Sequence, residues 1–164
     1  MLLELVVNSL LYIFPAYSAN AVPVVIGGGP PLDFGRVLTD GQPVFGSHKT
    51  LRGFFAGLVV GTLVGWGESL VFASYNPVLG LLLSLGALLG DLAGAFLKRR
   101  MGLTPGAFLP IIDQLDFVLG ALLLSLLLTP PSLLMALVIV ACTIPIHFLT
   151  NLLAYLLNVK SKPW

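Results

Sequence analysis

Charged residues are scarce in this sequence. Asp, Glu, Lys and Arg make up 9% of its 164 residues, against roughly a quarter in soluble domains. So few charges cannot cover a water-facing surface, and the mean hydropathy of +1.03 excludes a soluble domain. The net charge of +1 argues against a nucleic-acid-binding protein, which relies on a basic face. Because 57% of the residues are hydrophobic, the chain is not disordered and we predict an integral membrane protein.

Cysteine and histidine are nearly absent as well. Cys142 is the one cysteine and cannot form an intramolecular disulfide. The sequence contains no Cys/His cluster of the kind that holds structural zinc. We therefore expect neither a disulfide framework nor a zinc site.

Long apolar runs, in contrast, are abundant. A bilayer core needs about 20 apolar residues per helix, and five stretches reach or approach that length: 2–19, 51–73, 78–97, 115–129 and 133–157. The fourth is short, so we expect it to include residues 111–114 or to lie beside a polar pocket. The sequence predicts an all-α integral membrane protein, a single domain over residues 1–164 with five transmembrane helices. Polar loops are expected at residues 20–50 and 98–112.

The basic residues predict the orientation in the membrane. With five spans the termini lie on opposite sides, and every Lys and Arg falls on the side of the two polar loops and the C-terminus. Since basic residues favour the cytoplasm, we predict an external N-terminus and a cytoplasmic C-terminus in the cell membrane. The basic residues are Arg36, Lys49, Arg52, Lys98, Arg99, Arg100, Lys160 and Lys162.

Two stripes of small residues predict close helix packing. Glycines recur every four residues over 53–65 in the second span and over 86–94 in the third. Such stripes let helix backbones approach, so we expect these two helices to pack together; a homodimer seam is the alternative. In the fifth span, Thr143, His147 and Thr150 share one face with Asn151 beside them, and this polar stripe is expected to face the bundle interior.

Three aspartates are the strongest indication of chemistry. Asp91 lies inside an apolar helix, where an ionisable group is costly and indicates a functional site. Asp113 and Asp116 are three residues apart at the start of the fourth span, and align if the helix already begins there. Carboxylates at the inner surface suit an oxygen-ligated ion. We predict that the three bind Mg²⁺.

Cations surround these aspartates in sequence. The set comprises His48, Lys49, Arg52 and the run 98–100. Thr50, a polar residue, follows Lys49 directly. Carboxylates with clustered Lys and Arg suit Mg²⁺–nucleotide or phosphate chemistry, in which fixed cations neutralise developing charge. Binding to lipid headgroups would explain the run 98–100 on its own, and we assign only that role to Arg100, but it leaves the aspartates unexplained.

The motifs resemble a known family. A first block contains Asn20-Ala21-x-Pro23, Gly28-Gly29, Pro31-Leu32-Asp33-Phe34-Gly35, Asp40-Gly41 and Phe45-Gly46-x-His48-Lys49-Thr50-x-Arg52-Gly53. A second contains Gly90-Asp91-Leu92, Lys98-Arg99-Arg100, Gly102, Pro105-Gly106, Pro110 and Asp113-Gln114-Leu115-Asp116. Together, over essentially the whole chain, they resemble the archaeal CDP-archaeol synthases. They also look like a reduced bacterial CDP-diacylglycerol synthase, although residues 107–109 replace a Gly/His-rich stretch and several spans are missing.

The resemblance implies a Mg²⁺-dependent nucleotidyltransferase of ether phospholipid biosynthesis. It implies transfer of CMP from CTP to 2,3-bis-O-(geranylgeranyl)-sn-glycerol 1-phosphate, giving the unsaturated CDP-archaeol and pyrophosphate. The partners would be CTP, an isoprenoid ether-lipid phosphate and membrane lipids, with the active site on the cytoplasmic side. The expected catalytic residues are Asp91, Lys49 and Lys98, with Asp91, Asp113 and Asp116 at the metal. The expected substrate-binding residues are Asn20, Asp33, His48, Lys49, Thr50, Arg52, Lys98 and Arg99.

Two alternatives remain open at this point. One is the same reaction on diacyl phosphatidic acid. The other is a small transporter or membrane scaffold without enzymatic activity, which the glycine stripes alone would suit.

Overall fold

The computed structural model describes residues 2–72, 75–160 and 162, and these form five α-helices joined by irregular segments. The helices are α1 (Leu2–Ile26), α2 (Leu51–Val71), α3 (Pro77–Arg100), α4 (Ile112–Ser125) and α5 (Leu133–Leu156). The predicted five-helix fold is confirmed. Ala73, at the expected end of the second span, lies outside the described residues.

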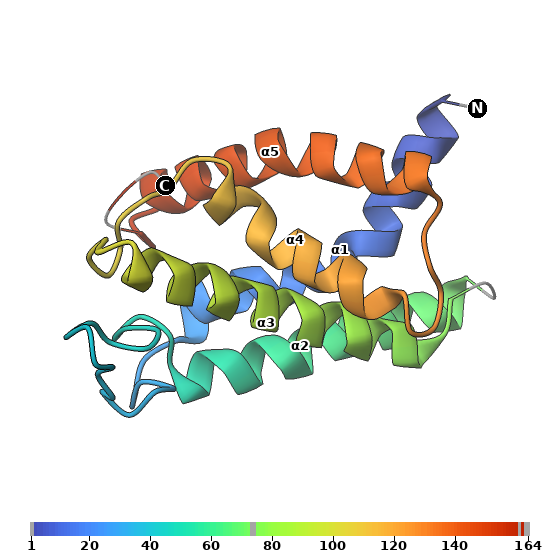
Figure 1. The fold of residues 1–164 in the computed structure, drawn as a ribbon. Coiled ribbons are helices and arrows are strands. Elements are labelled where there is room, and N and C mark those ends of the chain that lie inside the picture. The colour runs from blue at the N-terminus through green and yellow to red at the C-terminus, as the bar shows by residue number, and fades with distance from the viewer. Residues whose placement is uncertain (1, 73–74, 161, 163–164) are drawn as a thin grey trace.

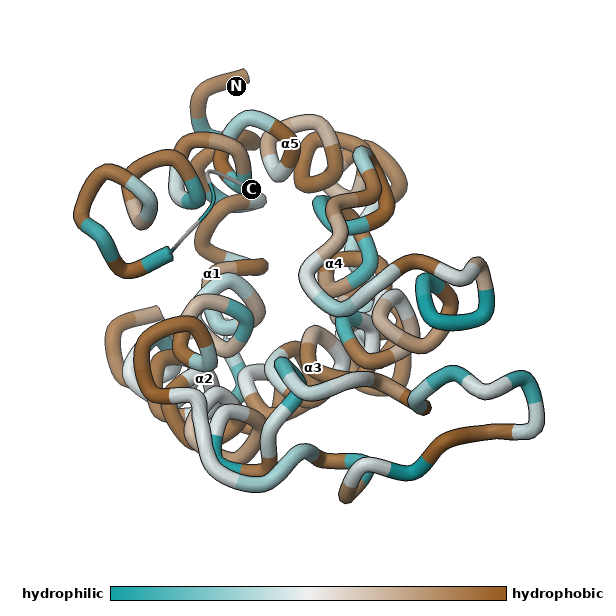
Figure 2. Tube along the Cα trace, turned by 90° about the vertical axis from the view of Figure 1, so that its left-hand side faces the viewer, coloured by the Kyte–Doolittle hydropathy of each residue, from teal (hydrophilic) through white to brown (hydrophobic). Residues whose placement is uncertain are grey.

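Figure 1 shows a bundle whose two ends differ. One end gathers the loop 27–50, the C-terminal ends of α3 and α5 and the N-terminal end of α4. Helix α1 begins at the other end. Figure 2 looks at the loop-bearing end and shows hydrophilic residues along its connecting segments, whereas the helices are predominantly hydrophobic. All eight basic residues belong to this end, which we call the basic end.

Four of the helices are long and apolar enough to cross a membrane, and α4 is the exception with 14 residues. It begins at Ile112, so it includes part of 111–114 as expected and already contains Asp113 and Asp116. Asp113 lies in the first turn of α4. Residues 101–111, between α3 and α4, form an irregular segment at the basic end.

Helices α1 and α3 extend further than predicted. Helix α1 continues through Asn20 to Ile26 although it contains Pro15 and Pro23, and α3 continues through Arg100. The polar loops are therefore 27–50 and 101–111 rather than 20–50 and 98–112. Proline is tolerated inside membrane helices because neighbouring groups satisfy the freed backbone carbonyls. Here the glycine face of α2 packs against both prolines.

The first glycine stripe joins α2 to two neighbours. Gly53, Gly57, Gly61 and Gly65 are all buried. A Cβ atom on Gly57 would press on the backbone of Ala19 in α1, and one on Gly65 would press on Gly80 of α3. Helices α2 and α3 thus pack together as predicted, with α1 sharing the stripe.

The second stripe packs elsewhere than predicted. Gly86 and Gly90 face the backbone of α4, at Gly120 and Asp116. The expectation that they contact α2 is wrong, because the α2-facing side of α3 is formed by Gly80, Ser84 and Leu88 instead. Both stripes are filled inside one chain, so neither supports a homodimer seam.

The polar stripe of α5 divides along the helix. Thr143 is fully buried and its Oγ1 lies 2.8 Å from the Tyr17 hydroxyl of α1, as expected for an inward face. Thr150, in contrast, is exposed and hydrogen-bonds to its own helix backbone. The inward face therefore comprises Thr143, His147 and Asn151.

Candidate active site

The first element of the site is an ion pair between the loop 27–50 and α3. Lys49 Nζ donates to both oxygens of Asp91, at 2.7 and 2.6 Å. Burial acts to lower the pKa of Lys49, but the charge and hydrogen bonds of Asp91 outweigh it and raise the pKa. Lys49 is therefore a firmly charged cation. The carboxylate inside the apolar helix has a partner 42 residues away in the chain.

A second ion pair joins the end of α3 to the start of α4. Lys98 Nζ lies 2.6 Å from Asp113 Oδ1, and both side chains are about 15% exposed. The other oxygen of Asp113 accepts a hydrogen bond from the backbone N–H of Leu109 at 3.0 Å, which fixes the segment before α4. Asp91 and Lys98 both belong to α3, and each pairs with a residue from another segment of the chain.

The third carboxylate, Asp116, lies against a glycine. A Cβ atom on Gly94 of α3 would overlap the Asp116 carboxylate, and one on Gly90 would overlap its backbone oxygen. Asp116 Oδ1 accepts from the adjacent Phe117 N–H at 2.6 Å. The charges of Asp91, Lys49 and Asp113 all act on Asp116. The two ion pairs and Asp116 thus form one electrostatic site at the basic end, which we call the paired-charge site.

The described residues contain no group of three His, Cys, Asp or Glu side chains arranged to hold a metal by themselves. Two of the three carboxylates already form ion pairs with lysines, in the pairs Lys49–Asp91 and Lys98–Asp113. A metal site built from Asp91, Asp113 and Asp116 is therefore not preformed. The Mg²⁺ assignment stays a prediction.

Arg99 is the most deeply buried cation, with 2% of its surface exposed. Within the described part of the chain, its Nε and Nη1 atoms have no hydrogen-bond partner. It lies beside Gly46, whose added Cβ atom would approach both Arg99 and Pro105. A buried guanidinium with free donors is costly unless an anion satisfies it, which suits the predicted role in substrate binding.

Arg100 contacts protein, not only lipid headgroups as predicted. Its guanidinium pairs with Asp40 at 2.8 Å and donates to the backbone oxygens of Gln42 and Pro43, at 3.2 and 2.6 Å. It also lies 5.1 Å from the centre of the Phe96 ring. Arg100 therefore fastens the loop 27–50 to the end of α3.

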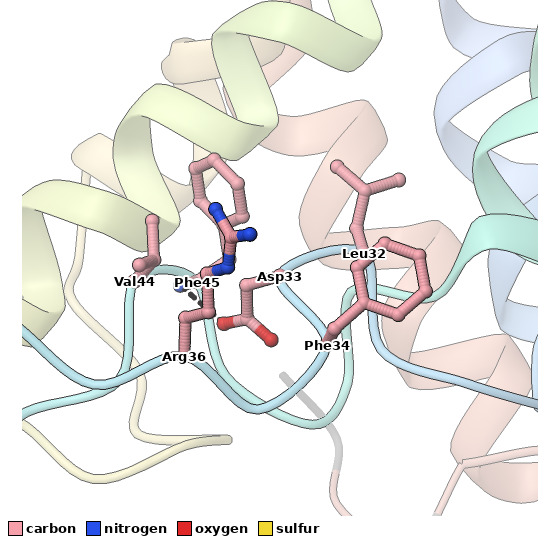
Figure 3. Close-up of a pocket in the computed structure, with 6 residues that line it drawn as sticks. All are labelled: Leu32, Asp33, Phe34, Arg36, Val44 and Phe45. Carbon is pink, nitrogen blue, oxygen red and sulfur yellow. Dashed lines mark hydrogen bonds between the residues drawn. The ribbon is translucent and has the colours of Figure 1, made fainter.

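Asp33 organises the loop rather than presenting a free carboxylate. It is 6% exposed and accepts hydrogen bonds from the backbone N–H groups of Gly35, Phe45 and Gly46, at 3.0, 2.8 and 3.0 Å. Burial acts to raise the pKa of Asp33, but these hydrogen bonds more than compensate and lower it. Figure 3 shows Asp33 within a pocket of the loop lined by Leu32, Asp33, Phe34, Arg36, Val44 and Phe45. In the structure Asp33 therefore holds the loop in shape, and its predicted contact with substrate stays a prediction.

Thr50 has a similar structural task at the start of α2. Its Oγ1 accepts from Gly53 N at 3.1 Å and from Gly28 N at 3.3 Å, so it caps the helix and holds the beginning of the loop. Helix α2 therefore begins at Leu51, two residues after Lys49, which places that lysine at the bundle end. Of the other predicted substrate-binding residues, His48 and Arg52 are exposed, and Asn20 is half-buried within α1.

Lys160, which we had counted only for topology, lies near the site. It is half-buried, and its Nζ donates to Asn151 Oδ1 of α5 at 2.6 Å. Burial and the nearby charges of Lys49 and Lys98 lower its pKa, against an opposing effect of Asp113. Asn151, on the polar stripe, was the available signal in the sequence. The turn that brings Lys160 back to it was not apparent.

Known proteins resemble this chain along nearly its whole length. The family model described as CarS-like CDP-archaeol synthase matches residues 2–164. The chain is 46% identical over 162 residues to the CDP-archaeol synthase of Methanopyrus kandleri, covering 96% of this chain and 92% of the relative. It is 43% identical over 165 residues to that of Pyrococcus furiosus, covering 97% and 98%.

A solved structure is similar along most of its length. It is described as an intramembrane enzyme for archaeal membrane lipids biosynthesis. The TM-score is 0.85 at 38% identity, over 89% of this chain and 94% of that one. These findings confirm the predicted multi-pass membrane enzyme and the predicted resemblance. This chain belongs to the CDP-archaeol synthase family.

Proposed function

We propose that this protein transfers CMP from CTP to 2,3-bis-O-(geranylgeranyl)-sn-glycerol 1-phosphate. The products are CDP-2,3-bis-O-(geranylgeranyl)-sn-glycerol and pyrophosphate. Support comes from the family and from the paired-charge site, where Lys49–Asp91 and Lys98–Asp113 meet Asp116. The single observation that carries the proposal is this convergence of three carboxylates and two lysines from the loop 27–50, α3 and α4.

The chemistry needs charge neutralisation more than a base. A phosphate monoester has a second pKa of about 6 and is largely dianionic at neutral pH. An oxygen of the lipid phosphate can therefore attack the α-phosphorus of CTP directly. The bond from that phosphorus to the bridging oxygen breaks, and pyrophosphate leaves. Lys49 and Lys98 neutralise the negative charge that develops on the phosphates.

Arg99 suits the phosphates for a different reason. A guanidinium presents several donors in a fixed plane and binds phosphate oxygens bidentately, whereas an ammonium acts as a point charge. The unpartnered Nε and Nη1 atoms of Arg99 supply such donors at a buried position beside the loop. We assign Arg99 to the phosphates of CTP.

The carboxylates fit a magnesium-bound nucleotide. Mg²⁺ commonly uses one or two carboxylates with substrate phosphates and water, rather than a cage formed by protein alone. Asp91, Asp113 and Asp116 offer hard oxygen ligands, and their lysine partners can turn to the phosphates when CTP arrives. When bound, the ion would polarise the phosphate oxygens and shield their charge.

We further propose that the site faces the cytoplasm, with the N-terminus outside. The basic end carries every Lys and Arg of the chain, and such residues favour the cytoplasmic side. CTP would then reach the site without crossing the membrane.

The acceptor can be tested on purified protein. Pyrophosphate release from CTP is measured in mixed micelles with matched amounts of the ether-isoprenoid phosphate or diacyl phosphatidic acid, with and without Mg²⁺. We expect fast, Mg²⁺-dependent release with the ether lipid and slow release with the diacyl lipid. Equal or faster turnover of phosphatidic acid would refute the acceptor assignment.

A further inference from the structure

The chain reverses direction directly after α5. Asn158 adopts a left-handed backbone conformation with φ of 57°. The backbone N–H groups of Val159 and Lys160 then both donate to the carbonyl of Ala154, at 2.9 and 3.1 Å. This turn ends the helix and brings Lys160 back alongside its last turns. Figure 1 shows the C-terminal end of α5 at the same end of the bundle as the C-terminal end of α3 and the segment before α4.

Lys160 is held there by the polar face of α5. Its Nζ donates to Asn151 Oδ1 at 2.6 Å, and the amide nitrogen of Asn151 lies 3.0 Å from the ring of His147 and donates to the His147 carbonyl at 2.9 Å. The amide is thereby oriented with its oxygen toward the lysine. Asn151 thus presents Lys160 in one direction.

Lys160 differs from the two lysines of the paired-charge site. Lys49 and Lys98 are each neutralised by an aspartate. Across the part of the chain that the structure describes, no carboxylate lies within salt-bridge distance of Lys160. Its charge nevertheless acts in the same region, because Lys49 and Lys98 repel it and Asp113 attracts it. A half-buried ammonium ion without a counter-ion is costly, and a phosphate would provide one.

Lys160 packs back on α5, the least buried of the four long apolar helices. Only Ile139 and Thr143 of α5 are buried. A lipid phosphate stays attached to chains that remain in the bilayer, so its subsite must adjoin a membrane-facing helix. CTP has no such constraint and can bind at the loop 27–50 and α3.

We propose that Lys160, oriented by Asn151, binds the phosphate of the lipid acceptor. The inference rests on the proposed function and divides its site into two parts. The nucleotide phosphates bind at Lys49, Lys98 and Arg99, and the attacking lipid phosphate binds on the α5 side. Lys160 then holds the nucleophile beside the α-phosphorus of CTP.

The test separates the two substrates. Initial rates are measured for the wild type, Lys160→Met, Lys160→Arg and the exposed-cation control Arg36→Gln. The lipid phosphate is varied in mixed micelles at saturating CTP, and CTP is then varied at saturating lipid. A hydrogen bond to a charged group contributes enough for a change of about tenfold or more. We therefore expect Lys160→Met to raise the KM for lipid phosphate about tenfold or more and to leave the KM for CTP unchanged.

Lys160→Arg should keep most of the affinity for the lipid, and Arg36→Gln should match the wild type. Thermal unfolding gives an independent measure, because the lipid phosphate should stabilise the wild type but not Lys160→Met. A rise in the KM for CTP alone, or no change in either KM with folding intact, overturns the inference. Failure of the proposed function would be seen in the wild type itself, as no turnover of the ether lipid.

Discussion

Substitution of Gly94 tests the position of Asp116 without touching a charged residue. A Cβ atom on Gly94 would overlap the Asp116 carboxylate, whose Cγ would be 2.9 Å away. Alanine in place of a helical glycine gains about 0.5–1 kcal/mol in backbone entropy, and overpacking costs about 1–3 kcal/mol. Because a carboxylate can rotate away, we expect Gly94→Ala to change the free energy of unfolding by less than about 2 kcal/mol. Turnover should fall at least about tenfold, since Asp116 is displaced.

Two other helical glycines provide matched controls. A Cβ atom added at Gly67 of α2 would meet open space, so Gly67→Ala should be fully active and slightly more stable. Gly90 faces the backbone oxygen of Asp116, which cannot rotate away, so Gly90→Ala should show the larger loss of stability. For a chain of this size about 1 kcal/mol shifts Tm by roughly 2–4 °C.

Two measurements are made on all three variants in detergent: the Tm of thermal unfolding and the rate of pyrophosphate release. The account requires Gly94→Ala to lose activity out of proportion to its Tm. If Gly94→Ala is folded and as active as Gly67→Ala, the place of Asp116 beside Gly94 has no role in catalysis.

Three further outcomes follow from the site and the loop. Asp91→Asn should fold but lose activity by orders of magnitude in the pyrophosphate assay, because it removes the charge of a carboxylate that holds Lys49 and is proposed to ligate Mg²⁺; near-normal turnover would contradict the site. In Asp33→Asn, the loop amides that donate to Asp33 should exchange their hydrogens faster than in the wild type. Since the pKa of Asp33 is lowered in the folded protein, the wild-type loop should stay protected above about pH 3.9, the unfolded pKa. The protection should be lost as the pH falls through the lower folded pKa. A cysteine introduced by Ser47→Cys in a Cys142→Ser background should react in intact cells only with membrane-permeant thiol reagents. Labelling by an impermeant reagent would show that this loop faces the outside and would contradict the predicted orientation.

The helices were largely predictable because membrane spans are encoded in local hydropathy. The exceptions have physical causes. Helix α1 continues past Pro15 and Pro23, both of which pack against the glycine face of α2, because proline is tolerated inside membrane helices. The partner of the second glycine stripe could not be read from spacing alone, since a stripe shows that a helix approaches but not which one.

The candidate site was predictable in composition but not in pairing. Asp91 was recognised because a charge inside an apolar helix is costly, and Asp113 and Asp116 because they are three residues apart at the start of the fourth span. Their partners, Lys49 and Lys98, depend on how the loop 27–50 and α4 meet α3, which is a tertiary property. For Thr50 a local rule was available, because a threonine before an apolar run is a typical helix cap.

Lys160 shows the limit of reading a sequence by local pattern. A lysine in a short polar tail is most simply explained by membrane topology. Its contact with Asn151 depends on the turn at Asn158, where a residue other than glycine adopts positive φ. Neither hydropathy nor residue spacing predicts such a turn.

The most direct test of the central claim follows the atoms of CTP. Purified protein is supplied with the ether-isoprenoid phosphate, Mg²⁺ and CTP that carries a radioactive phosphorus at either the α or the γ position, and the lipid and aqueous products are separated. The account predicts that α label appears in the lipid product and that γ label appears only in pyrophosphate. Absence of α label from the lipid, or release of γ label as inorganic phosphate, would contradict cytidylyl transfer.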